Sequence, residues 1–141
     1  MGEISLIAPL MLGVVFAVLA LLHFSWFLGS QWGLDASLPT DETGKRVLNP
    51  KKVDSLIVGL GLALFSAFYF AKWYDVQLAP NQTIASIISW LIPSIFLLRS
   101  IGEFRYVGLF KKVKNTRFGK LDTTFIIPLC LIIAVLGFLV I

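Results

Sequence analysis

Three ionisable side chains interrupt or border the long apolar stretches of this chain: His23, Arg99 and Glu103. A histidine can carry a proton near neutral pH, and a guanidinium can hold an anion through several N–H groups. Glu103 follows Arg99 by four residues, which places both on one face of a helix and permits an ion pair. We expect the three to meet between helices and to line a polar pocket. Alternatively, Arg99 extends to a membrane surface, Glu103 pairs with Arg99 or Arg105, and His23 donates to a backbone carbonyl.

A basic segment from 99 to 122 holds seven of the twelve lysines and arginines. Within it, Tyr106, Leu109, Phe110 and Val113 have the spacing of one helical face, which predicts an amphipathic segment in the plane of a membrane surface. The residues expected to contact lipid headgroups occupy its other directions: Lys111, Lys112, Lys114 and Arg117. The alternative is that this segment only fixes the orientation of the protein.

The elements that must position these residues are long apolar runs. Of the 141 residues 57% are hydrophobic, and the mean hydropathy is +0.87, which is too apolar for a soluble domain of this length. Four runs are long enough to cross a bilayer as helices. We expect an all-α fold, a four-helix transmembrane bundle that forms a single integral membrane domain over residues 1–141. The predicted helices cover residues of about 4–28, 50–74, 83–104 and 123–141.

The charges predict how this bundle sits in the membrane. Eleven of the twelve lysines and arginines fall in or beside the first and third connections, and only Lys72 is on the other side. Because cytoplasmic loops carry an excess of basic residues, both basic connections should be cytoplasmic and both termini outside. The segment around Lys111 is then a basic interfacial segment in the second cytoplasmic loop.

Composition also excludes several classes of function. The chain has one histidine and one cysteine, Cys130, so no cluster of these residues can hold a metal, and no cofactor is expected. No Ser-His-Asp set, HExxH motif or phosphate-binding glycine loop can be assembled. The distribution of basic residues favours anionic lipids over nucleic acid as a partner.

Small residues recur every four positions along the second predicted helix, at Gly59, Ala63, Ala67 and Ala71. Such spacing lets two helix backbones approach closely. The expected use is packing within the bundle, and the alternative is the interface of a homodimer.

Three sequence phrases together resemble a known family. The first is His23 to Gly29 (HFSWFLG), the second is Arg99 to Gly108 (RSIGEFRYVG), and the third is Thr116 to Leu129, which includes TRF and LD. They resemble a family of small bacterial four-helix integral membrane proteins known only as a domain of unknown function. That family has an aspartate where this chain has Glu103, a change that keeps the charge.

The resemblance implies a bacterial inner-membrane protein and no particular activity. It also implies that five residues belong to one binding site: His23, Trp26, Arg99, Glu103 and Arg105. Two functions are compatible with this sequence. The first is a non-enzymatic binding or accessory protein with a cytoplasmic-facing polar site for a lipid headgroup or a small anion. The alternative is a small membrane enzyme or transporter that uses His23, Arg99 and Glu103.

Overall fold

The computed structural model describes residues 2–141, and it is all-α, as predicted. Four of its helical segments are long and apolar enough to cross a membrane. Within residues 2–141 the only β pairing is an isolated bridge between Thr40 and Arg46. The elements are α1 (Gly2–Phe27), α2 (Leu34–Ser37), α3 (Lys52–Trp73), α4 (Gln82–Ile101), α5 (Arg117–Leu121), the π-helical turn η1 (Asp122–Ile126) and α6 (Ile127–Leu139). The last three form one continuous helical segment, Arg117–Leu139.

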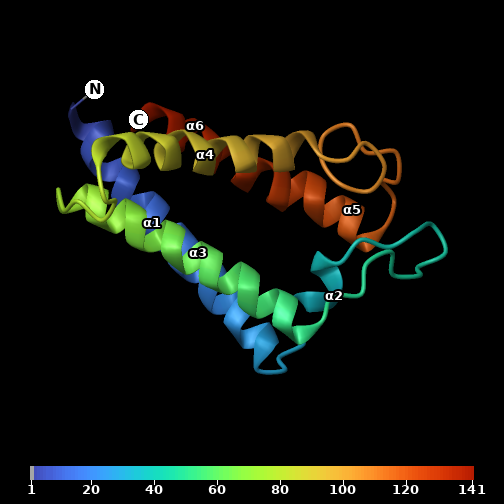
Figure 1. Cartoon of the computed structure of the whole chain (residues 1–141). Coiled ribbons are helices and arrows are strands. Elements are labelled where there is room, and N and C mark those ends of the chain that lie inside the picture. Colours follow the sequence, from blue (N-terminus) through green and yellow to red (C-terminus); the bar gives the residue numbers. More distant parts are fainter. Residues whose placement is uncertain (1) are drawn as a thin grey trace.

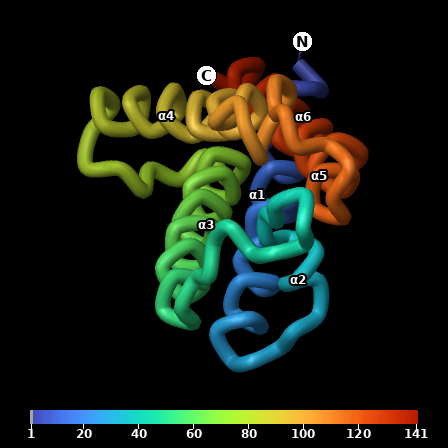
Figure 2. The backbone as a smooth tube through the Cα atoms, turned by 90° about the vertical axis from the view of Figure 1, so that its right-hand side faces the viewer, coloured from blue at the N-terminus to red at the C-terminus, as the bar shows by residue number. Residues whose placement is uncertain are grey.

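The long helices associate as two antiparallel pairs, α1 with α3 and α4 with α6 (Figure 1). The pairs meet near the two chain termini and diverge toward the opposite end. That opposite end carries the two longer connections, residues 28–51 and 102–116, which Figure 2 shows beside each other. Both basic loops therefore lie at one end of the molecule and both termini at the other.

Aromatic packing around Phe16 joins the two pairs. Phe16 is fully buried and contacts three rings, with centroid distances of 5.6 Å to Phe65, 5.7 Å to Tyr69 and 5.2 Å to Phe96. These rings belong to α3 and α4, so a single side chain of α1 links both helix pairs. Ring pairs of this kind stabilise beyond the apolar area that they bury.

Close backbone approach holds α1 against α3. A Cβ atom added to Gly59 would lie 2.7 Å from the ring of Phe24, so this glycine packs against α1 within the chain. The Ser66 hydroxyl donates to the carbonyl of Gly13 across the same interface, at 2.7 Å. Packing within the bundle therefore accounts for Gly59, while a homodimer through the small-residue stripe stays a prediction.

Two predicted helix boundaries are wrong. The third predicted helix was extended through Arg99 to residue 104, but α4 ends at Ile101 because Gly102 has φ of 81° and ψ of −170°, a conformation outside the helix that essentially only glycine adopts. The fourth was expected to start at 123. It starts instead at Arg117, because the Thr116 hydroxyl accepts a hydrogen bond from the N–H of Gly119. Asp122 consequently lies inside the helical segment.

Candidate functional site

A buried carboxylate, Asp122, organises the end of the molecule that carries the basic loops. It has no solvent-exposed surface. Its Oδ1 accepts a hydrogen bond from Arg99 Nη2 at 2.9 Å. Its Oδ2 accepts from the backbone N–H of Gly108 at 2.9 Å and from Lys111 Nζ at 3.2 Å. One carboxylate thus joins α4, the loop 102–116 and the last helical segment, and we call Arg99, Lys111 and Asp122 the buried charge cluster.

A π-helical turn places Asp122. The N–H of Ile127 donates to the carbonyl of Asp122, five residues earlier, instead of to the residue four positions back. This turn separates α5 from α6 and lies one residue after the end of α5. Single π turns inside α-helices occur frequently at functional sites. The irregular backbone at Asp122 is therefore a second feature, besides its burial, that marks this position as part of a candidate site.

Lys111 is buried with its ammonium fully bonded. The residue is 3% exposed, and Nζ lies 3.2 Å from Asp122 Oδ2, 3.3 Å from the carbonyl of Gly108 and 2.6 Å from Thr123 Oγ1. An ammonium has three N–H donors, and all three have acceptors here. This geometry corrects the expectation that Lys111 faces lipid headgroups. The other three residues of that prediction, Lys112, Lys114 and Arg117, are exposed.

The loop 102–116 is irregular, so the predicted amphipathic helix is absent. Two glycines let the loop fold back on itself: a Cβ on Gly102 would lie 1.9 Å from the carbonyl oxygen of Val107, and a Cβ on Gly108 would lie 2.3 Å from that of Ile101. The N–H of Leu109 also donates to the carbonyl of Ser100 at 2.8 Å. Buried bonds between the loop and α4 thus override the helical spacing of its apolar residues.

The buried charge cluster carries a surplus of positive charge, because two cations share one carboxylate. Arg99 Nη1 is also buried and has no hydrogen-bond partner within residues 2–141. The Arg99 side chain as a whole is 31% exposed, so part of it reaches the surface of the protein. A buried donor without an acceptor is costly, and a partly desolvated cation attracts anions more strongly than one in water.

Glu103 does not form the predicted ion pair with Arg99. Its Oε1 accepts the backbone N–H groups of Tyr106 and, at 3.2 Å, of Val107, so the carboxylate closes its own turn. Arg105 is exposed, with its guanidinium carbon 5.1 Å from the centroid of the Tyr106 ring. The physical reason is that α4 ends before Glu103, which removes the helical register on which the pairing depended.

His23 belongs to the other helix pair. Its Nδ1 lies 2.8 Å from the carbonyl of Leu19, one turn earlier in α1, and its ring packs against that of Trp26 at a centroid distance of 4.7 Å. Trp26 Nε1 donates to the carbonyl of Trp32 at 2.8 Å and ties the first loop to the helix. Figure 1 shows the C-terminal ends of α1 and α4 far apart. The structure therefore does not group His23 and Trp26 with Arg99.

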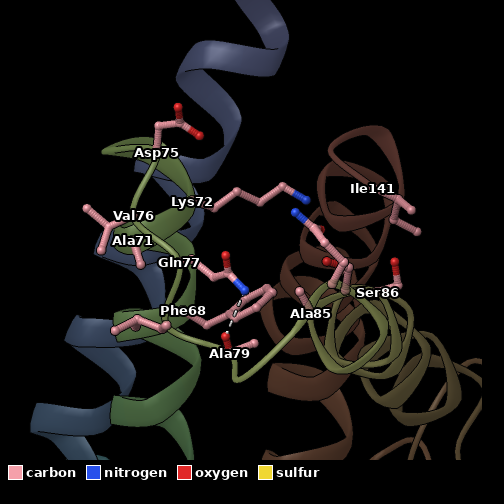
Figure 3. A pocket seen from close by; sticks show the side chains of 13 residues that line it. Phe68, Ala71, Lys72, Asp75, Val76, Gln77, Ala79, Ala85, Ser86 and Ile141 are labelled. Atoms are coloured by element: carbon pink, nitrogen blue, oxygen red, sulfur yellow. Dashed lines mark hydrogen bonds between the residues drawn. The ribbon is translucent and has the colours of Figure 1, made fainter.

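Two cavities open at opposite ends of the molecule. One, of about 380 Å³, lies between the ends of α3 and α4 and the loop that joins them, and Figure 3 shows Lys72 extending across it toward Ile141. The other, of about 600 Å³, lies between the first loop and the segment 112–118, and we call it the interloop cleft. His23 lines neither cavity.

One carboxylate at the interloop cleft is stabilised in its charged form. The Thr43 hydroxyl and the backbone N–H groups of Lys45 and Thr43 donate to Asp41 Oδ1, at 2.6, 3.0 and 2.9 Å. These bonds, that from the Thr43 hydroxyl first, lower the pKa of Asp41 below its ordinary value of 3.8. The carboxylate is therefore ionised at neutral pH.

The predicted helix over 123–141 left Asp122 just outside it, and the sequence did not group Asp122 with Arg99. The signal that could have found the cluster is charge matching, because Asp122 is the only acidic residue after Glu103, and seven basic residues from Arg99 on precede it. A lone carboxylate at the start of one apolar run is a natural partner for a cation inside the run before it. Lys111 gave no comparable signal, since four neighbouring basic residues look alike in sequence.

The fold and the buried charge cluster together define a small all-α membrane protein of four apolar helices, with eleven of its twelve lysines and arginines in or beside the two longer connections. Within that class, the chain belongs to the family described as "Protein of unknown function (DUF3995)", whose sequence model matches residues 16–137. The matched range contains His23, Arg99, Lys111 and Asp122, and membership confirms the resemblance seen in the sequence. No curated protein and no solved structure matches the chain.

Proposed function

We propose that this protein is a non-enzymatic binding or accessory protein that holds an anionic group, either a lipid headgroup or a small anion, beside Arg99. The observation that carries the proposal is the charge of the buried cluster, where Arg99 and Lys111 share the single carboxylate of Asp122. The Lys111 ammonium is fully bonded, so the uncompensated charge falls on Arg99. An anion at the exposed edge of Arg99 would neutralise that surplus, and a small rotation of the guanidinium would offer it Nη1.

The proposed setting is a bacterial inner membrane with both basic loops in the cytoplasm. Eleven of the twelve lysines and arginines lie at or near the loop end of the molecule, which favours this orientation. Anionic lipids are enriched where such basic segments meet the cytoplasmic leaflet. Lys112, Lys114 and Arg117 would then supply exposed positive charge around the site.

Orientation is tested by cysteine labelling in intact cells. In a background with Cys130→Ala, Lys45→Cys should react with a membrane-impermeant maleimide only after permeabilisation, whereas Leu78→Cys should react without it. Both positions are exposed on their loops. The opposite labelling pattern would overturn the proposed orientation.

Anion binding is tested by native mass spectrometry of the full chain with phosphatidylglycerol and phosphatidylcholine of equal chain length. We expect preferential retention of phosphatidylglycerol, which Arg99→Lys should reduce while keeping the ion pair to Asp122. Arg105→Gln is the matched control, because Arg105 is exposed and packs only on its neighbouring ring. Titration with inorganic phosphate, read as thermal stability, distinguishes a free anion from a lipid. Equal retention by the two variants would contradict the proposal.

A further inference from the structure

The interloop cleft has walls of opposite charge. Carboxylates of Asp35, Asp41 and Glu42 line the side formed by the first loop. Lys112, Lys114 and Arg117 line the side formed by the second loop and the start of α5. The cavity volume of about 600 Å³ is in the range of small-molecule sites.

The two walls do not neutralise each other. Within residues 2–141, no ion pair crosses the cleft: Asp35 pairs with Arg46 of its own loop, and the remaining ion pairs belong to the buried charge cluster. The Asp41 carboxylate is held by the turn that it closes, through Thr43 and Lys45. Charges of opposite sign are thus kept apart across a space large enough for a ligand.

The walls are also built on supported elements. In the first loop, α2 packs against α5, so the two sides of the cleft are fixed relative to each other. Phe118 lines the cleft and is only 3% exposed, which anchors the basic wall to the protein core. A preorganised pair of walls favours one ligand orientation, because little order is lost on binding.

We propose that the interloop cleft binds a zwitterionic phosphoethanolamine group, with its phosphate on the basic wall and its primary ammonium on the acidic wall. A simple anion would be attracted by one wall and repelled by the other, whereas a group with both charges is attracted at each end. The cleft lies at the loop ends of the apolar helices and includes the first residues of the segment Arg117–Leu139, where a bilayer would place its headgroups. A primary ammonium donates hydrogen bonds to carboxylates, which a trimethylated choline cannot do.

This inference goes beyond the proposed anion site, since it uses neither Arg99 nor Lys111 nor Asp122. The experiment is native mass spectrometry of the full chain with equimolar phosphatidylethanolamine, phosphatidylglycerol and phosphatidylcholine of equal chain length. We expect the ethanolamine lipid to be retained most. Glu42→Gln and Lys114→Gln should each lower its retention roughly two- to fivefold, as expected for losing one exposed charge interaction. Only Lys114→Gln should also lower retention of phosphatidylglycerol.

Controls for these variants lie outside the cleft. Lys120→Gln removes an exposed charge from α5, and Glu3→Gln removes one from the far end of the molecule, so both should leave retention unchanged. Arg99→Lys should also leave retention of the ethanolamine lipid unchanged, which separates this site from the anion site. Soluble phosphoethanolamine as competitor tells the sources apart: displacement of the lipid indicates recognition of the headgroup alone, and lack of displacement indicates that acyl chains contribute. Retention of phosphatidylethanolamine no greater than that of phosphatidylcholine, or insensitivity of its retention to Glu42→Gln, would overturn the proposal.

Discussion

Replacement of Asp122 by asparagine should be among the most damaging single changes at the loop end of the molecule. The substitution keeps the size of the side chain but removes the charge that Arg99 and Lys111 share. Lys111 would then be a buried cation, 2% exposed, without a counter-ion. Removing one partner of a buried ion pair costs about 3–5 kcal/mol, a large part of a total stability of about 5–15 kcal/mol.

The matched control is Asp35→Asn. Asp35 also pairs with an arginine, Arg46, but both side chains are largely exposed, at 58% and 43%. An exposed pair contributes about 0–1 kcal/mol, so the two asparagine variants should differ by at least about 2 kcal/mol. The measurement is the unfolding equilibrium in mixed detergent micelles with an increasing fraction of denaturing detergent.

A double-mutant cycle tests whether the unpaired Lys111 ammonium causes the destabilisation by Asp122→Asn. Lys111→Met removes the buried cation, so it should be less damaging in the Asp122→Asn background than in the wild type. Two results would refute this reasoning. One is that Asp122→Asn destabilises no more than Asp35→Asn, and the other is that the effects of Lys111→Met and Asp122→Asn simply add.

Three further changes test other parts of the structure. Gly59→Ala should lower the free energy of unfolding by about 1–3 kcal/mol, because the added Cβ would meet an aromatic ring of α1. In the control Gly61→Ala the added Cβ has no neighbouring atom within 4 Å, so this variant should be neutral or more stable by up to about 1 kcal/mol. Equal unfolding midpoints would contradict the packing. Gly102→Ala should open the loop 102–116, since φ at this position is 81° and the added Cβ would meet a carbonyl oxygen. Tryptic cleavage within the loop should therefore be faster in the variant. An unchanged cleavage rate would refute the folded loop. The pKa of Asp41, followed by the NMR shift of its carboxyl carbon, should lie below 3.8 and rise in Thr43→Val. Because this folded-state pKa is lowered, the contribution of the turn to stability is present above about pH 4 and lost as the pH falls through the folded-state pKa. If the pKa of Asp41 is the same in Thr43→Val as in the wild type, the hydroxyl has no such role.

The positions of the apolar helices follow from sequence because lipid leaves a spanning segment few choices. Every backbone N–H and C=O in the hydrocarbon layer must be bonded within the segment, so a long apolar run must be a helix. The start of α4 at Gln82, where Asn81 Oδ1 accepts the N–H of Ile84, lies one residue from the predicted start at 83. The ends near charged residues were less predictable, because an arginine inside an apolar run is compatible with a helix that stops at Ile101 or continues to Phe104.

The candidate site could be predicted only in part from the sequence, for a related reason. The spacing of apolar residues in the loop 102–116 indicated a helix. Gly102 and Gly108 instead let the backbone of the loop pack closely against itself and against the end of α4, and a continuous helix could not keep these contacts. The spacing of Arg99 and Glu103 suggested a pair, yet Glu103 bonds the backbone of its own turn. The helical spacing of the loop thus yielded to contacts between segments, and the predicted ion pair yielded to hydrogen bonds within one turn.

The sequence by itself therefore determined that this is an all-α protein of four apolar helices, with its basic residues gathered in two connections. Those properties depend on composition and on spacing along the chain. Only the tertiary structure decided that Asp122 is the carboxylate that Arg99 and Lys111 share, and that acidic residues of the first loop face basic residues of the second across a cleft. The physical reason is that a charge takes its partner from whichever segment the fold brings within a few ångströms, and three separate segments meet at Asp122.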